Sequence, residues 1–127
     1  MRTFSLIRIL ILAAFVAGCA SQVAYRPEAF KAVERSAQQT LKTLAQTTEV
    51  QLDTGYSRTL KAGSQWVHAG TISQGEVYKP YKDVFTLEGA HIHEANLVVA
   101  NDQLVGFYLP VERGFSSLAR KAALKFN

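Results

Sequence analysis

A short apolar run near the start of the chain divides the sequence into two unequal parts. Residues 9–17 carry no charge and lie between Arg8 and the region of Cys19, the only cysteine. As a helix, these nine residues would extend about 14 Å, less than half of a hydrocarbon core that is about 30 Å thick. The run is therefore too short to span a membrane stably, and the fold has to come from the residues beyond it.

The residues up to Cys19 have the order of an export signal: positive charge, an apolar run and then small residues. The last four residues of the pattern are Val16, Ala17, Gly18 and Cys19. From Met1 to Ser21 the chain resembles the signal sequence of bacterial lipoproteins, which signal peptidase II cleaves before the cysteine. The resemblance implies removal of residues 1–18 and a diacylglyceryl group on the sulfur of Cys19.

Such a lipid would hold the protein firmly at a membrane. Each buried methylene contributes about 0.8 kcal/mol, and stable anchoring takes more than one acyl chain. In Gram-negative members of the family, an amide-linked third chain is common, and an Asp after the cysteine often retains the protein in the inner membrane. That position is Ala20 here, so the resemblance implies the periplasmic face of the outer membrane.

Removal of residues 1–18 from the 127-residue chain leaves 109 residues, the size of one domain. We expect residues 19–26 to form a lipidated tether and residues 27–127 to form a single periplasmic domain. Acylation of Cys19 would leave no thiol, so the core has to form without disulfides. Without Arg2 and Arg8, 12 basic residues stand against 10 acidic ones, a balance that does not predict nucleic-acid binding.

Two segments have the residue spacing of helices. Pro27 and Glu28 suit a first helical turn, and apolar residues then recur every three or four positions as far as Gln46. The members of this stripe are Phe30, Val33, Ala37, Leu41 and Leu44. A second, short helix is expected over residues 116–125. The first helix is expected to pack on a sheet, with a role as a partner-binding coiled-coil strand as the alternative.

Between these two segments the apolar period changes from near 3.6 to 2, which predicts strands. The expected strands are 49–53, 56–60, 65–72, 76–78, 84–87, 92–100 and 103–109. Asn101 and Asp102 tolerate positive φ and favour a two-residue hairpin turn between the last two strands. The pattern predicts an α+β fold: an N-terminal amphipathic helix, a small antiparallel sheet or partly closed barrel, and a short C-terminal helix.

Three histidines are the candidates for metal chemistry. His91 and His93 lie two positions apart on an expected strand, so their side chains share a face, and His68 from another strand could join them. Imidazoles in that arrangement could bind zinc or copper. However, the same face continues with apolar Ala95 and Leu97, which favours hydrogen-bonded histidines at the edge of a core. A small-molecule or metal-binding lipoprotein is therefore the alternative function, and no cofactor besides the lipid is expected.

The sequence contains no familiar pattern for catalysis. Its serines lack the G-x-S-x-G turn, it has no glycine-rich phosphate loop, and its carboxylates are dispersed. We therefore expect a protein that is not an enzyme.

Aromatic residues are frequent in the strand region, and tyrosine is enriched where proteins meet. One segment interleaves tyrosines with lysines around a proline. Its expected partner contacts are Tyr78, Lys79, Tyr81 and Lys82. The sequence thus favours a lipid-anchored envelope protein with a binding or structural role in a periplasmic or outer-membrane assembly, whose protein partner is unidentified.

Overall fold

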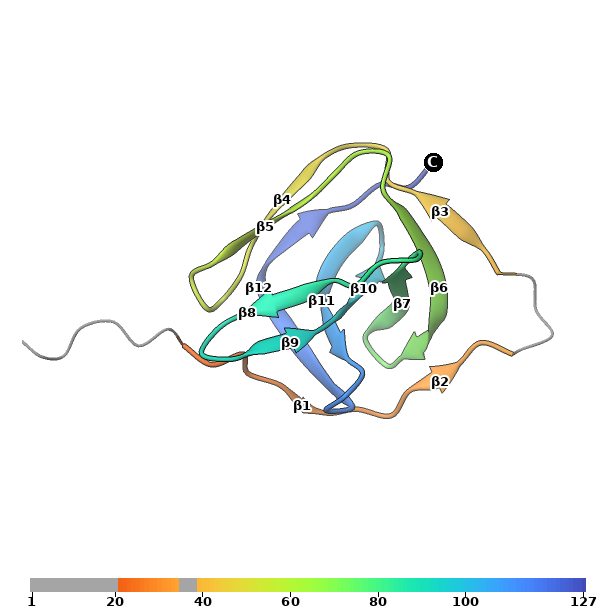
Figure 1. Ribbon diagram of the computed structural model, residues 1–127. Coiled ribbons are helices and arrows are strands. Elements are labelled where there is room, and N and C mark those ends of the chain that lie inside the picture. Colours follow the sequence, from red (N-terminus) through yellow and green to blue (C-terminus); the bar gives the residue numbers. More distant parts are fainter. Residues whose placement is uncertain (1–20, 35–38) are drawn as a thin grey trace, which may run out of the picture.

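The computed structural model describes residues 21–34 and 39–127, and strands alone build this part of the chain (Figure 1). The first six strands are β1 (Arg26–Pro27), β2 (Lys31–Ala32), β3 (Leu41–Thr43), β4 (Thr48–Gln51), β5 (Ser57–Leu60) and β6 (Gln65–Ile72). The other six are β7 (Gly75–Pro80), β8 (Thr86–Glu88), β9 (Ile92–Glu94), β10 (Asn96–Ala100), β11 (Gln103–Leu109) and β12 (Gly114–Ala123). Within the described ranges, no helix is long and apolar enough to cross a membrane.

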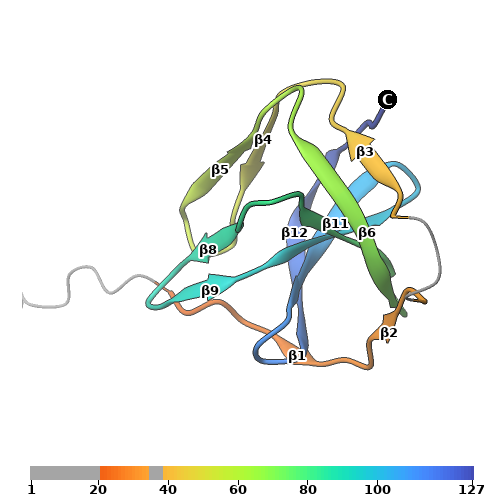
Figure 2. The ribbon, with the colours of Figure 1, turned by 45° about the vertical axis from the view of Figure 1, so that its right-hand side comes forward.

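Eight of these strands form one curled antiparallel sheet. Its spatial order is β1, β12, β11, β10, β7, β6 and β2, and β3 pairs with a different stretch of β6. The strands β4 and β5 form a separate hairpin, as do β8 and β9. Figures 1 and 2 show the sheet curling into a half-barrel, with the two hairpins on its hollow side.

The N-terminal segment brings the two edges of the sheet together. β1 pairs with β12 at one edge and β2 pairs with β6 at the other, although only residues 28–30 separate β1 from β2. Elsewhere along the curl, Leu44 forms an isolated antiparallel bridge with Phe126, beyond the end of β12. The edges of the half-barrel are thus joined at two places by pairing between distant parts of the chain.

The predicted α+β class is wrong, because the described part of the chain is all-β. Where a helix was expected over residues 27–46, the chain instead forms β1, β2 and β3, and residues 35–38 lie outside the described ranges. An unpaired sheet edge leaves backbone N–H and C=O groups without partners. These three short strands supply partners for the edge strands β12 and β6, and this pairing outweighs the helical periodicity.

The burial of the expected apolar stripe agrees with this correction. Phe30, Val33 and Leu41 are 36%, 40% and 43% exposed, whereas Leu44 is 1% exposed. A helix packed on the sheet would have buried all of them together. Ala37 lies outside the described residues.

The prediction of a short C-terminal helix over residues 116–125 is also wrong. Residues 114–123 form β12, the longest strand, which pairs with β11 and with β1. Buried Ser116 and Leu118 alternate with exposed Ser117 and Ala119, which is the burial period of a strand. Ala, Arg and Lys are good helix formers, but intrinsic helix propensity is a small term, and pairing with β11 overrides it.

The strands predicted in the middle of the chain agree better with the structure than the two predicted helices do. β6 spans the expected residues 65–72, and β10 pairs with β11 around Asn101 and Asp102. These two turn residues have φ values of 52° and 59°, so the predicted hairpin turn is confirmed. Here the local turn chemistry and the apolar alternation agree with the tertiary pairing.

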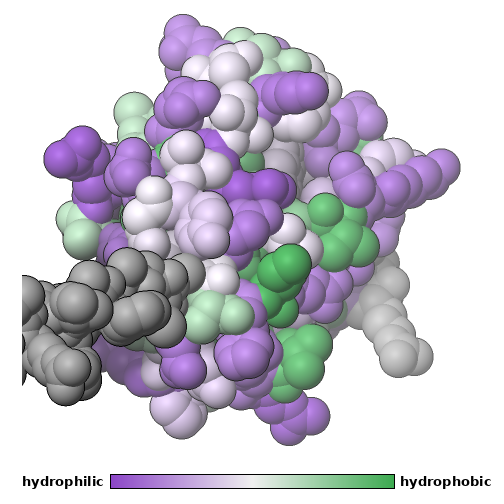
Figure 3. Space-filling view, turned by 60° about the vertical axis from the view of Figure 1, so that its left-hand side comes forward, coloured by the Kyte–Doolittle hydropathy of each residue, from purple (hydrophilic) through white to green (hydrophobic). Residues whose placement is uncertain are grey.

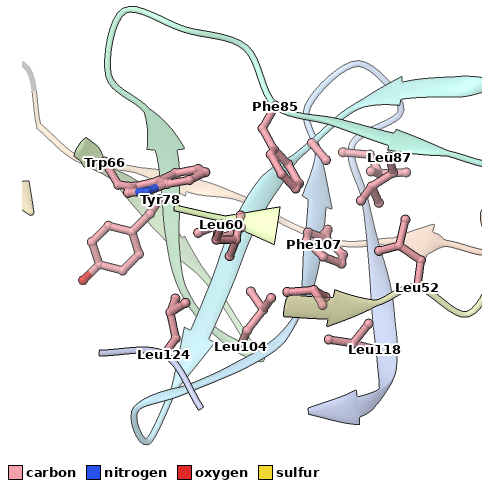
Figure 4. Close-up of a cluster of buried hydrophobic side chains, with 14 of the residues drawn as sticks. Leu52, Leu60, Trp66, Tyr78, Phe85, Leu87, Leu104, Phe107, Leu118 and Leu124 are labelled. Atoms are coloured by element: carbon pink, nitrogen blue, oxygen red, sulfur yellow. The ribbon is translucent and has the colours of Figure 1, made fainter. Parts of the chain in front are cut away.

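The main hydrophobic core fills the hollow side of the sheet, which we call the inner face (Figure 4). The sheet contributes Trp66, Tyr78 and Phe107, the β4–β5 hairpin contributes Leu52 and Leu60, and Leu87 comes from β8. Burial of one such side chain contributes about 1.5–3 kcal/mol. The two hairpins therefore close the inner face and supply much of its apolar contact.

The opposite side of the sheet, which we call the outer face, carries a smaller cluster. Its buried members are Ile72, Val77, Val98, Tyr108 and Phe115. Neighbouring residues on the strands alternate between the faces: Leu97 and Phe107 belong to the inner core, and Val98 and Tyr108 to the outer cluster. The segment between β1 and β2 lies against part of this outer cluster, because Phe30 stacks on Tyr108.

Candidate functional site

A broad groove lies on the outer face, beside the segment that crosses between the sheet edges. Its volume is about 750 Å³. The residues that line it include Glu28, Phe30, Lys79, Asn96, Tyr108 and Arg113. We call this feature the outer groove. It combines an aromatic surface with three charged groups, each from a separate part of the chain.

Glu28 fixes the crossing segment to the rest of the domain. Its amide donates to the carbonyl of Arg113 at 3.1 Å. Its carboxylate accepts hydrogen bonds from Ser73 Oγ at 2.8 Å and from Gln74 Nε2 at 2.9 Å. These bonds, that from Gln74 foremost, favour the charged form and lower the pKa of the Glu28 carboxyl group. The segment is thus attached both to the β11–β12 turn and to the β6–β7 turn.

Two aromatic rings form the apolar surface of the outer groove. Phe30 from the crossing segment stacks on Tyr108 of β11, with ring centroids 4.8 Å apart and planes inclined by 18°. Tyr108 is 5% exposed, and burial raises the pKa of its hydroxyl group. The close approach of this segment requires glycine at position 70, because a Cβ there would collide with the carbonyl oxygen of Lys31 and would lie 2.5 Å from the Phe30 ring. A glycine within a strand often permits such a close approach.

The charged side chains that line the outer groove include more cations than anions. Lys79 and Arg113 are cationic, and Glu28 is the one lining carboxylate. Within residues 21–34 and 39–127, neither Lys79 nor Arg113 takes part in an ion pair. The groove can therefore accept a group that combines an apolar portion with negative charge.

The four expected partner contacts do not form one surface. Tyr78 faces the inner core, where its ring lies 5.1 Å from that of Phe126, and burial raises the pKa of its hydroxyl group. Lys79 faces the other way and lines the outer groove. Tyr81 and Lys82 follow the end of β7, and Lys82 Nζ lies 5.2 Å from the centre of the Tyr81 ring.

The three histidines are placed separately. The Nε2 atom of His68 contacts Glu76, whose carboxylate also accepts a hydrogen bond from Thr71. His93 Nδ1 lies 2.9 Å from Glu112 Oε1, and His91 is exposed. Among the described residues, no group of three His, Cys, Asp or Glu side chains could hold a metal ion.

The sequence pattern indicates Lys79 as a contact residue, but it does not indicate that Phe30 and Arg113 lie beside it. Because Phe30 fits the spacing of a helical stripe, the pattern does not predict its approach to the sheet. The available signal was Gly70 in the middle of a strand, because a missing side chain there allows another segment to come close. Cys19 and the preceding Val16, Ala17 and Gly18 lie outside the described residues.

We compared the chain with protein-family models, with curated proteins and with solved structures, and none of the three comparisons found a significant match.

Proposed function

We propose that this protein is a lipid-anchored component of a bacterial cell envelope that acts by binding, without catalysis, through its outer groove. The observation that carries the binding role is the Phe30–Tyr108 stack beside Lys79 and Arg113. Aromatic residues and arginine are enriched at the centres of protein interfaces.

The anchoring part of the proposal rests on the lipoprotein-like sequence Val16-Ala17-Gly18-Cys19. A diacylglyceryl group on Cys19 would hold the domain at a membrane, since two acyl chains suffice for stable attachment. With Ala20 after the cysteine, the periplasmic face of the outer membrane is the proposed location.

The binding part specifies a partner chemistry. The groove volume of about 750 Å³ suits a short peptide segment or a compact side-chain cluster. The stacked rings favour an apolar or aromatic residue, and the two cations favour a neighbouring Asp or Glu. We therefore propose that the partner is an envelope protein that presents an apolar residue next to an acidic one.

Site-specific cross-linking in living cells tests this role. A photoactivatable residue replaces Ala29, which is exposed and lines the outer groove. We expect an adduct with a discrete protein, and we expect Lys79→Glu with Arg113→Glu to remove it. The matched control is Lys125→Glu, which reverses an exposed charge at the C-terminal end of the chain. An adduct that survives reversal of both groove cations would contradict a groove-mediated role.

A further inference from the structure

The chain is attached to the body of the domain from the first residue of the described range. The carbonyl of Ser21 accepts a hydrogen bond from the amide of Ala90 at 3.0 Å. A Cβ added at Gly89 would lie 2.8 Å from the same carbonyl oxygen, so the two segments touch. Val23 is 7% exposed and belongs to the inner core. Residues 21–26, expected as part of a tether, therefore pack on the domain beside the β8–β9 turn.

This attachment limits how far the domain can stand from a lipid on Cys19. Cys19 precedes Ser21 by two positions. Two residues of fully extended chain reach at most about 7 Å. A bilayer has a polar layer of about 5–8 Å on each side of its hydrocarbon core. Anchoring at Cys19 would therefore place the β8–β9 turn at the level of the lipid headgroups.

Three exposed hydrophobic residues lie on the segments near that turn. Ile92 and Val111 are 71% and 74% exposed, the highest values among the exposed large hydrophobic residues of the described ranges. Tyr25, four residues after Ser21, is 48% exposed. Figure 3 shows hydrophobic side chains gathered on this side of the molecule, near the point where the described chain begins.

Two contacts bring together the segments that carry these three residues. His93 Nδ1 lies 2.9 Å from Glu112 Oε1, so β9, which carries Ile92, lies beside the β11–β12 turn, which carries Val111. The ring of Tyr25 lies 6.3 Å from that of His93, in an edge arrangement. Tyr25, Ile92 and Val111 thus lie on segments that meet at His93, and Ile92 is two residues along the chain from the attachment at Ala90. We call this set the exit patch.

We infer that the exit patch rests in the interfacial layer of the bilayer, so that the lipid fixes not only the location of the domain but also which side faces the membrane. This inference rests on the proposed lipid anchor. Tyrosine is favoured at membrane interfaces, and exposed aliphatic side chains insert at the boundary between headgroups and acyl chains. Figures 1 and 2 place β3 and the C-terminus on the side away from the start of the described chain, so these would face away from the bilayer.

A fluorescent depth probe tests the orientation. The full chain carrying Ile92→Cys or Val111→Cys is purified in its processed form, labelled with an environment-sensitive dye and reconstituted into phosphatidylethanolamine–phosphatidylglycerol vesicles. An acylated Cys19 leaves the introduced cysteine as the only free thiol, because the chain has no other. The matched control is Leu41→Cys, an exposed aliphatic position on β3. The replaced side chains are all exposed, so unchanged melting temperatures are expected.

We expect blue-shifted emission at positions 92 and 111, at least twofold quenching by lipids with a nitroxide close to the headgroup, and no such response at position 41. If the protein floats with the vesicles but positions 92 and 111 behave like 41, the orientation is wrong and the anchor stands. If the processed protein does not float with vesicles, the anchor itself fails and the orientation fails with it.

Discussion

The two faces of the sheet are covered to very different extents. In the described part of the chain, 16 buried residues form the inner core, and only 5 form the outer cluster. Two hairpins close the inner face, whereas the outer face is crossed by a single segment that leaves the outer groove open. The inner face therefore stabilises the fold, and the outer face can present side chains for binding at a small cost in stability.

The strongest test of this difference is Phe107→Ala. Phe107 is 2% exposed on the inner face and stacks on Phe85 with centroids 6.0 Å apart. Its truncation removes a large apolar side chain and leaves a cavity, so we expect the free energy of unfolding to fall by about 3–5 kcal/mol. Urea denaturation measures the change, and a loss below about 1 kcal/mol would mean that the inner face is not the main source of stability.

Gly70→Ala probes how closely the crossing segment approaches the outer face. The new Cβ would collide with the carbonyl oxygen of Lys31 and would lie 2.5 Å from the Phe30 ring, so the segment has to shift, at an expected cost of about 1–3 kcal/mol in unfolding free energy. Denaturation of Gly70→Ala alone and combined with Phe30→Ala separates the causes. We expect the cost to diminish only in part when Phe30 is truncated, because the Lys31 carbonyl oxygen remains. A cost that does not diminish at all would show that the ring is not what the methyl group displaces.

Phe30→Ala is the outer-face counterpart of Phe107→Ala. Phe30 is 36% exposed, and an aromatic pair contributes about 0.5–1.5 kcal/mol beyond its buried area. We expect the unfolding free energy to fall by no more than about 2 kcal/mol, while the cross-link at position 29 is lost. Equal destabilisation by the two Phe→Ala variants would remove the distinction between the faces.

The smallest expected effect concerns the hydrogen bonds to Glu28. Because these bonds lower the pKa of its carboxyl group, they stabilise the attached segment at pH values above the ordinary carboxyl range, and the contribution is lost as the pH falls through the lowered value. Gln74→Ala removes the larger influence, so we expect the Glu28 pKa to rise toward its usual range. A carboxyl-carbon NMR titration measures this shift, and Ser73→Ala should give a smaller one.

Apart from β12, strands that pair with their neighbours in the sequence could be predicted from the sequence, whereas strands that pair with distant residues could not. The β10–β11 hairpin was predictable because Asn101 and Asp102 encode their own turn between alternating strands. The segment before residue 46 was not, because β1, β2 and β3 become strands by pairing with residues far away in the sequence. β12 pairs mainly with the preceding strand β11, but its helix-forming residues hide the strand. Where the apolar spacing is compatible with a helix, only pairing with other strands decides the outcome.

The outer groove was predictable only in part, for the same reason. Lys79 stood out beside tyrosines and a proline, but its neighbours in space are Phe30, Tyr108 and Arg113, which lie tens of residues away in the chain. Strand alternation then separated Lys79 from Tyr78, which the sequence had grouped with it. Grouping by sequence distance cannot anticipate which face of a curled sheet each residue occupies.

The anchor at Cys19 is the premise on which the binding location and the membrane-facing side both depend. Its most direct test is the intact mass of the native protein, extracted in detergent from cells that express the full chain. We predict a chain that begins at Cys19 and carries a diacylglyceryl group, and we predict that Cys19→Ser abolishes this species. A native chain that retains Met1 and an unmodified Cys19 would contradict the anchor.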